Sequence, residues 1–411
     1  MQNSLLTNKK ILAAIDLGST KTSCMIAECD LKTETLHVLG VGQHASKGIK
    51  NNVIVDMEAV ENVILNVVNT AEKMAGLTIK DVVVNISGEH LISEVINIRL
   101  KIPSRPITDE DLNHMISQAT HVDEKKDFEI IHAIPLSYTI DGRKGIQDPR
   151  GMIGQNIVCS LHIITGDKGP VQTLVNCIHR CHLGIQAIVA SSIASSFATL
   201  GDDETELGVT LIDIGGGTTD IALFVEGQVI HTESLQLGGR HISSDIAHGL
   251  STSLAQAERI KTLHGTAVHT MADDHVTLSV AQMGDDAHES PIKKTFLTSI
   301  IQARLEEIFE IIKDRLAQSN MHIIASKRVV LTGGGSQMPG IKDLASRVLG
   351  KKVRLGKPSK LQGLSESALN PSFATCTGLL IFAMKDMYQQ QETLEAESWF
   401  DSVKTWVKTI F

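Results

Sequence analysis

Two aspartates, each at the end of an apolar run and just ahead of a glycine turn, are the residues best suited to do chemistry. Glycine lets backbone N–H groups approach an anion, and nearby hydroxyl groups add further donors. A carboxylate at a strand end suits Mg²⁺, which proteins usually hold through water, one or two carboxylates and the phosphates of the substrate. The pattern therefore predicts a site for phosphate and magnesium. Its residues are Asp16 and Asp213 for the metal, mainly through water, and Gly18, Ser19, Thr20, Lys21, Gly215, Gly216, Gly217 and Thr218 for the phosphates.

Apolar residues on both sides of each turn predict two β-hairpins, over residues 11–27 and 209–224. Neither turn is a P-loop, because the upstream glycine of that motif is missing. Neither is a dinucleotide fingerprint, because no helix follows directly. Either motif by itself could be an ordinary glycine turn, but the pair suggests two similar halves that close on one ligand.

A third glycine turn follows a predicted strand over residues 328–332. We expect Pro339 to open a helix over residues 341–349, because proline is well placed at a first helical position. The backbone of a turn without side chains can lie closely against a nucleoside. This turn is therefore a candidate for the base and sugar of a nucleotide.

A predicted helix over residues 255–261 adds a carboxylate and an ammonium group. Glu258 and Lys261 are three residues apart and so lie on one helical face. Such a pair is suited to hold ribose hydroxyl groups. The alternative is an exposed ion pair without a ligand.

These three turns, in this order, resemble the motifs of the superfamily that contains actin, Hsp70 and the sugar kinases. Residues 16–22 are similar to its first phosphate loop, residues 213–220 to its second, and residues 331–336 to its adenosine loop. The resemblance implies an α/β, two-lobed, actin-like ATPase fold with ATP and Mg²⁺ between the lobes. It also implies ribose contacts for Glu258 and Lys261, and an adenosine flanked by Gly333, Gly334, Gly335 and Met338.

An insert between the two phosphate loops, over residues 85–165, does not belong to a minimal two-lobed ATPase. Its pattern predicts a small α+β subdomain. The expected elements are an extended segment over 95–102, a helix opened by Thr108, strands over 127–135 and 136–142 with a turn between them, a loop over 145–154 and a strand over 158–165. The remaining expected units are 1–84 and 166–203 for the first lobe, 204–250 and 319–386 for the second, and an inserted subdomain over 251–318.

The insert narrows the resemblance to the FtsA family of bacterial cell-division proteins. The residues that carry it are His132, Pro135, Tyr138, Asp141, Gly142, Asp148, Pro149, Gly151, Met152 and Gly154. The resemblance implies that the insert serves self-contacts and the recruitment of later division proteins such as FtsN. It also implies that FtsZ binds the subdomain over 251–318.

The end of the chain has a different character. Residues 387–397 are polar and predict a flexible linker. Residues 398–411 predict an amphipathic helix, too short to cross a bilayer but suited to lie in the headgroup region of a phospholipid membrane. The alternative is a helix that docks on the protein itself or on a partner. The predicted membrane-binding residues are Trp399, Phe400, Val403, Trp406, Val407, Ile410 and Phe411.

Composition limits the remaining functions. The chain of 411 residues has a net charge of −9 and 3% aromatic residues, which argues against a nucleic-acid partner. Six cysteines without framework spacing, and no evident signal peptide, indicate a reducing cytoplasm. The group Cys177, His179, Cys181 and His182 is better explained by a buried helix than by zinc.

The superfamily resemblance implies that a vigorous ATPase would carry a glutamate or glutamine in the segment that crosses between the lobes, where it orients a water molecule. The matching segment here, residues 188–196, contains no carboxylate or amide. We therefore expect weak ATP hydrolysis or none. The favoured function is an ATP-binding, actin-like division protein that self-assembles at the cytoplasmic face of the inner membrane, anchors the FtsZ ring and helps to recruit later division proteins. The alternatives are another membrane-associated actin-like cytoskeletal protein or, less favoured, a small-molecule kinase.

Overall fold

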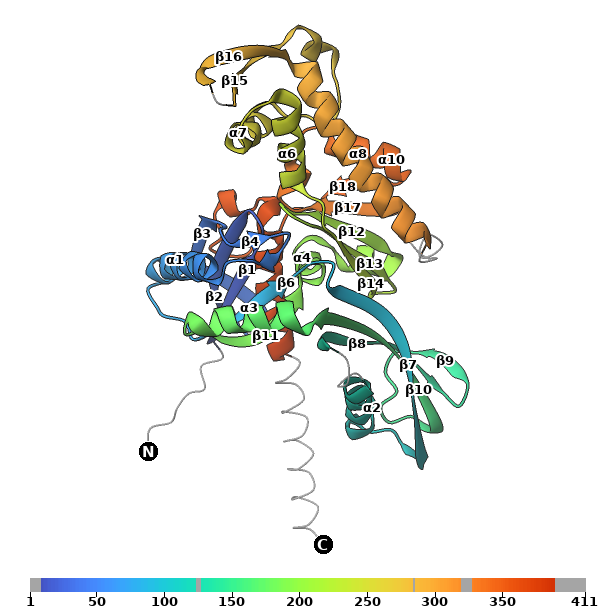
Figure 1. The fold of residues 1–411 in the computed structure, drawn as a ribbon. Helices are drawn as coiled ribbons and strands as arrows, with labels where there is room; N and C mark the ends of the chain where they lie inside the picture. Colours follow the sequence, from blue (N-terminus) through green and yellow to red (C-terminus); the bar gives the residue numbers. More distant parts are fainter. Residues whose placement is uncertain (1–8, 123–126, 284, 319–326, 389–411) are drawn as a thin grey trace.

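Two five-stranded sheets with the same strand order form the centre of the molecule. The computed structural model describes residues 9–122, 127–283, 285–318 and 327–388 (Figure 1). The first sheet has the order β11-β6-β1-β2-β3: β1 Lys9–Leu17, β2 Lys21–Asp30, β3 Thr35–Ala45, β6 Asp81–Ile86 and β11 Gly184–Ala190. The second has the order β14-β13-β12-β17-β18: β12 Val209–Ile214, β13 Thr219–Val225, β14 Gln228–Leu235, β17 Arg328–Thr332 and β18 Lys352–Leu355.

Each sheet combines three antiparallel strands with two parallel ones. Strand β1 pairs antiparallel with β2 and parallel with β6, and β12 pairs antiparallel with β13 and parallel with β17. Both predicted hairpins are thereby confirmed. Because the carboxyl ends of parallel strands meet at one edge, the turns after β1 and β12 each lie beside the end of a second strand.

Helices cover both faces of each sheet, which explains the continuous apolar runs of the strands. Ala13 and Ile15 of β1 pack towards the outer helices, whereas Leu12 and Ala14 face the inner core. The first lobe carries α1 Met57–Ala75 and α3 Lys168–Arg180. The second carries α6 Gly239–Leu250, α7 Leu254–His264, α8 Lys294–Gln318 and α10 Ile341–Leu349.

The two lobes share one inner core. Residues of β1 and β2 and residues of β12 and β17 pack in the same cluster, together with α4 Ser191–Thr199 and the helical residues 374–388. The chain passes from the first lobe to the second through α4 and α5 Asp202–Leu207, and it returns through residues 374–388. The shared core and the two connecting segments therefore join the lobes. One glycine turn lies at the edge of each sheet.

Helix α1 illustrates why these residues form these elements. The carboxylate of Asp56 accepts a hydrogen bond from the N–H of Ala59, and Gly76, at φ 71°, ends the helix in the left-handed conformation. The helix packs closely on β3 because of a glycine: a Cβ at Gly42 would lie 1.9 Å from the carbonyl oxygen of Val67.

The inserted subdomain is a separate four-stranded sheet with the order β7-β10-β8-β9 and a helix, at the lower right of Figure 1. Its elements are β7 Leu91–Pro106, α2 Asp109–Val122, β8 Phe128–Ile140, β9 Arg143–Ile146 and β10 Ile153–Asp167. It touches the second lobe at β14, where the N–H of Thr232 donates to Ser93 Oγ at 3.0 Å and the ring of His162 donates from Nδ1 to the carbonyl oxygen of Val229 at 2.8 Å.

Three expectations for local structure were wrong. One strand, β8, replaces the two strands and turn expected over 127–142, because the register shifts at Pro135 and the proline, which has no N–H, is accommodated in a bulge. The loop expected over 145–154 is shorter, since it overlaps the ends of β9 and β10. Pro339 precedes α10 by two residues, and Gly340, at φ 79°, is the N-cap.

The smaller elements complete the architecture. The short hairpin of β4 Ile49–Lys50 and β5 Val53–Ile54 lies near the first glycine turn, and the hairpin of β15 Thr277–Gln282 and β16 Asp285–Lys293 extends the second lobe at the top of Figure 1. The described residues also form the 3-10 turns η1 Met271–His275, η2 Gly334–Gln337, η3 Glu366–Ala368 and η4 Pro371–Phe373.

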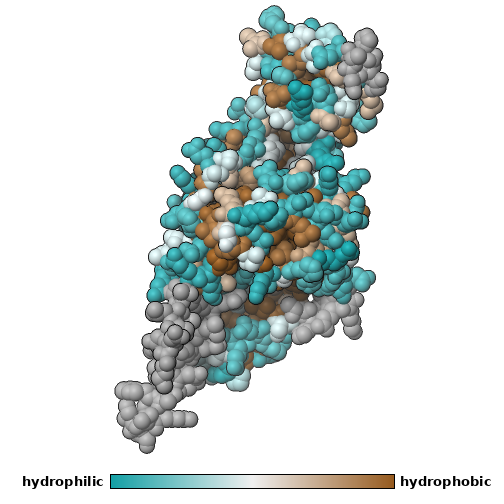
Figure 2. Space-filling view, turned by 90° about the vertical axis from the view of Figure 1, so that its left-hand side faces the viewer, coloured by the Kyte–Doolittle hydropathy of each residue, from teal (hydrophilic) through white to brown (hydrophobic). Residues whose placement is uncertain are grey.

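The surface on the α1 side carries hydrophobic residues over its middle, between more hydrophilic regions (Figure 2). Leu65 and Met74 of α1 are among the exposed large hydrophobic side chains of the protein. Within the described residues, no helix combines the length and the apolar character needed to span a membrane. The predicted amphipathic helix over 398–411, and all but the first two residues of the predicted linker, lie outside the described residues.

The cysteine-containing helix is buried, as predicted. In and just after α3, the side chains of Leu174, Cys177, Ile178 and Cys181 are at most 6% exposed and pack in the first-lobe core. Burial raises the pKa of the Cys177 thiol to about 12 and that of Cys181 to about 11. Packing therefore explains these cysteines.

Candidate functional site

A cleft of roughly 540 Å³ lies where the glycine turns of the two lobes meet. It is lined by residues of both phosphate turns, by the third glycine turn and by α7. The predicted site residues on its wall are Asp16, Gly18, Ser19, Thr20, Lys21, Asp213, Gly215, Gly216, Thr218, Glu258, Lys261, Gly333, Gly334, Gly335 and Met338. The predicted residue Gly217 is not among the residues that line the cavity, and a Cβ there would meet Ser19 and Asn51. Residues from distant parts of the sequence thus converge on one cavity.

The two phosphate turns are each closed by a backbone hydrogen bond, from Gly18 to Lys21 at 3.1 Å and from Gly215 to Thr218 at 2.9 Å. The turns also approach each other closely. A Cβ at Gly216 would lie 2.5 Å from Thr20 Oγ1, and one at Gly217 would lie 2.4 Å from Ser19 Oγ. Larger residues at these glycines would push the turns apart.

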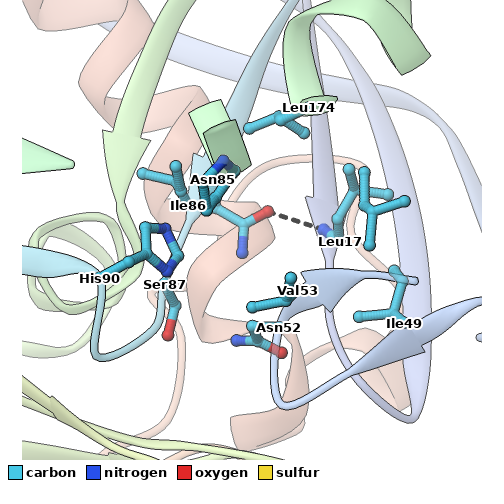
Figure 3. A pocket seen from close by; sticks show the side chains of 11 residues that line it. Leu17, Ile49, Asn52, Val53, Asn85, Ile86, Ser87, His90 and Leu174 are labelled. Carbon is cyan, nitrogen blue, oxygen red and sulfur yellow. Dashed lines mark hydrogen bonds between the residues drawn. The ribbon is translucent and has the colours of Figure 1, made fainter. Parts of the chain in front are cut away.

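Asp16 and Asp213 lie on β1 and β12, and the strands that pair parallel with these two, β6 and β17, also end at the cleft. Asn85, at the end of β6, accepts a hydrogen bond from the N–H of Leu17 at 2.7 Å (Figure 3). It also donates to Ser191 Oγ at 3.0 Å. In the second lobe, Gly333 follows β17 at φ 81°, and a Cβ there would lie 2.1 Å from Asp213 Oδ1. The third glycine turn is therefore packed directly on the second aspartate.

Three buried carboxylates face the cleft. Burial raises the pKa of Asp16 to about 6 and that of Asp213 to about 7, and it also raises the pKa of Asp220. Repulsion among the carboxylates adds to each of the first two shifts. Ser87 Oγ donates to Asp220 at 2.6 Å. A site with so much buried negative charge accepts a phosphate only together with a cation or with protons.

Magnesium fits this donor set. Hard oxygen ligands such as Asp16 and Asp213 suit it. Within the described residues, no three side chains of the types His, Cys, Asp and Glu gather closely enough to enclose a metal by themselves. Water and the phosphates would complete the coordination of a metal at this place.

Lys21 reaches across to the segment that returns to the first lobe. Its Nζ donates to the carbonyl oxygen of Ser372 at 2.5 Å and lies 3.4 Å from the ring centroid of Phe373. Burial lowers the pKa of this lysine, whereas Asp16 opposes that shift. Lys21 therefore lines the cleft, but its ammonium group is engaged with Ser372.

The expected ribose residues form an ion pair on the wall of the cleft. Lys261 Nζ lies 2.8 Å from the carboxylate of Glu258, and it donates to the carbonyl oxygen of Gly239 and to Ser243 Oγ, both at 2.8 Å. The lysine side chain is 12% exposed and that of Glu258 is 52% exposed. Lys261 thus fastens α7 to α6, which leaves the carboxylate of Glu258 partly open to a ligand.

The sequence did not single out several residues of the cleft. Asn85 and Asp220 could have been predicted from the sequence, because both lie in strands next to the phosphate turns. No sequence pattern marks Asn52 or Thr375 as site residues, because their segments are distant in sequence from the glycine turns. The other lining residues are Ser191, Gly239, Ile242, Thr262, Gln337, Pro339, Pro371 and Ser372.

Comparison with known proteins identifies the family. The profile described as "Cell division protein FtsA" matches residues 210–378, and the profile "SHS2 domain inserted in FTSA" matches residues 88–165. The cell division protein FtsA of Rhizobium meliloti (strain 1021) is 37% identical, over 98% of this chain and 95% of that protein. This chain belongs to the FtsA family of cell division proteins.

Other FtsA proteins agree. That of Agrobacterium fabrum is 38% identical over 90% of this chain and 86% of its own length. That of Escherichia coli (strain K12) is 28% identical over 98% of this chain and 99% of its own length. The chain is thus a cell-division protein, as the resemblance implied. FtsA membership also favours this function over the kinase and over other cytoskeletal proteins.

Solved structures confirm the two-lobed, actin-like fold, and the second profile matches the inserted subdomain. The chain titled "PilM-PilN type IV pilus biogenesis complex" has a TM-score of 0.66 at 14% identity, over 91% of this chain and 98% of that chain. MreB5 of Spiroplasma citri bound to ADP has a TM-score of 0.57 at 13% identity, over 94% of this chain and 99% of that chain. At these identities the likeness concerns the fold.

Proposed function

We propose that this FtsA-family protein binds ATP with Mg²⁺ in the cleft and uses the nucleotide as a ligand for self-assembly. The observation that carries the proposal is the convergence of both glycine turns, Asp16 and Asp213 on one cavity. Phosphates would lie between the two turns, Mg²⁺ beside the aspartates, and adenosine between the third glycine turn and α7.

At the cellular level, we propose assembly on the cytoplasmic face of the inner membrane at the division site. The amphipathic segment over 398–411 would be the membrane anchor, and the chain would tether the FtsZ ring to it. Recruitment of later division proteins such as FtsN would involve the inserted subdomain, and FtsZ would bind the subdomain over 251–318. Family membership supports this part.

Hydrolysis should be slow. Ser191, the first residue of α4, lines the cleft, and the crossing segment over 188–196 brings no carboxylate or amide side chain. Asn85, which also lines the cleft, is held in the wall by its hydrogen bonds to the N–H of Leu17 and to Ser191 Oγ. Nucleotide would therefore act as an assembly ligand rather than as a substrate in rapid turnover.

Calorimetric titration of the full chain tests the nucleotide proposal. ATP with Mg²⁺ should bind with measurable heat, and chelation of Mg²⁺ should weaken the binding. Phosphate release should stay below about 1 s⁻¹, a modest enzyme rate. Absence of ATP binding, or turnover well above that rate, would contradict the proposal.

A further inference from the structure

The turn of the β4–β5 hairpin presents an asparagine at the meeting point of the two phosphate turns. Pairing of Ile49 with Ile54 and of Lys50 with Val53 leaves a two-residue turn, Asn51 and Asn52. Their φ angles are 48° and 59°. Positive φ at both central residues is the geometry of a tight hairpin turn, and asparagine tolerates it. The backbone thus fixes the direction of the Asn52 side chain.

Asn52 connects the phosphate turns of the two lobes. Ser19 Oγ, in the first turn, donates to Asn52 Oδ1 at 2.6 Å and accepts from the N–H of Asn52 at 2.8 Å. Asn52 Nδ2 donates to Thr218 Oγ1, in the second turn, at 3.0 Å. One side chain therefore ties Ser19 of the first phosphate turn to Thr218 of the second.

The side chain also stands on the wall of the cleft. Asn52 lines the large cavity together with Ser19 and Thr218, and it also lines a small cavity of about 20 Å³ behind the first turn. In Figure 3 its amide extends from the hairpin towards the segment that carries Ser87. The Nδ2 atom has two N–H groups, and within the described residues one of them donates to Thr218. The other is available to a ligand in the cleft.

We propose that Asn52 is a further phosphate-binding residue, whose side-chain amide donates a hydrogen bond to a phosphate oxygen while it sets the spacing of the two turns. The inference rests on the proposed function, because it concerns the same ligand. A hydrogen bond from an amide N–H to an anion is stronger than one to a neutral acceptor. Ser19 cannot replace it, because the hydroxyl proton of Ser19 already goes to Asn52 Oδ1.

The test compares variants of the full chain that keep the turn. Asn52→Gly removes the amide, and glycine adopts the positive φ at no steric cost. Asn52→Asp keeps the size but replaces the donor with a second acceptor that repels phosphate. Asn51→Gly is the matched control, because it alters the neighbouring residue of the same turn and its contact with Gln236.

Each variant is titrated by calorimetry with ATP and Mg²⁺, and separately with adenosine. We expect Asn52→Gly to weaken ATP binding about tenfold, the value of one hydrogen bond to a charged group, and Asn52→Asp to weaken it further. Adenosine binding should not change, and Asn51→Gly should behave as wild type.

If the wild type binds ATP, two results would overturn this inference but not the proposed function. One is unchanged ATP affinity in Asn52→Gly, and the other is an equal loss for ATP and adenosine, which would show a role in shaping the cleft rather than in binding phosphate. Failure of the wild type to bind ATP would overturn the proposed function, and the inference with it.

Discussion

Buried carboxylates dominate the chemistry of the cleft at the scale of single residues. The pKa of Asp213, raised to about 7, lies above its ordinary value of 3.8, so the folded protein holds a proton that the unfolded chain releases. The folded state is therefore favoured at low pH, and its stability falls as the pH rises from about 4 through about 7. Asp16, with a pKa of about 6, acts in the same direction.

Replacement of Asp213 by asparagine should remove its part of this pH dependence. Without Mg²⁺ at pH 8, we expect Asp213→Asn to stabilise the fold by at least about 1 kcal/mol, the value of one pKa unit, while it weakens binding of ATP with Mg²⁺. Thermal unfolding from pH 5 to pH 8 measures the first effect. The exposed Asp202→Asn is the control. Equal melting temperatures of wild type and Asp213→Asn at pH 8 would contradict this explanation.

A second prediction follows from the close contact between the two phosphate turns. A methyl group at Gly217 would lie 2.4 Å from Ser19 Oγ and 2.9 Å from Asn51 Cα, so Gly217→Ala must move one turn away from the other. We expect a loss of about 1–3 kcal/mol in the free energy of unfolding, as for other overpacked sites, and weaker ATP binding. Chemical denaturation and calorimetry measure the two effects.

Gly169 supplies the control for this substitution. A Cβ at Gly169 has nothing within 4 Å, so Gly169→Ala should leave ATP affinity and stability close to those of wild type. Wild-type behaviour of Gly217→Ala would show that the turns have room to separate.

At this scale, the residues that line the cleft were predictable where a pattern in the local sequence marks them. Asp16 and Asp213 stand beside their glycines in the chain, and the structure places both turns on the cleft wall. Asn52 and Thr375 reach the cleft from distant segments and carry no local pattern. The partner of Lys21, the carbonyl oxygen of Ser372, was likewise invisible, because a backbone group has no identity in a sequence.

At the scale of elements, the hairpins and helices followed from apolar periodicity, and two of the three errors lay at prolines. A proline in the position of Pro135 predicts the end of a strand, but the bulge in β8 accommodates the missing N–H. Pro339 predicts the start of a helix, but the turn η2 and Gly340 separate the glycine turn from α10. A proline marks an irregularity, whereas tertiary pairing decides which kind.

The C-terminal amphipathic segment gives a prediction for one element. A peptide of residues 398–411 should be unordered in water and gain helicity on phospholipid vesicles, because so short a helix needs a surface to fold on. Val407→Gln, on the apolar stripe, should reduce this gain, whereas Thr405→Gln, on the polar side, should preserve it. Circular dichroism measures both. Equal helicity of the two variants on vesicles would argue against an amphipathic anchor.

At the scale of the whole molecule, the fold places the cleft between two similar sheets that share one inner core. A ligand held by both turns therefore contacts both lobes and can alter their relative position. The sequence predicted this architecture because the two phosphate turns repeat. It could not give the contact of the inserted subdomain with β14, through Ser93 and His162, because that contact joins segments without a shared pattern.

Assembly and membrane attachment should support each other. One amphipathic helix binds a membrane reversibly, whereas several helices in one polymer raise the effective concentration and exceed the affinity of one by on the order of a hundredfold. ATP in the cleft would thus strengthen membrane binding without touching the membrane.

Liposome co-sedimentation, with and without ATP and Mg²⁺, tests this central claim most directly when the intact chain is compared with one that ends at Glu397. We expect the intact chain to sediment with liposomes, more strongly with nucleotide, and the shortened chain to remain in the supernatant. Equal sedimentation of both chains would contradict the membrane anchor. If the same amount of intact chain sediments with and without ATP, nucleotide-linked assembly would be contradicted.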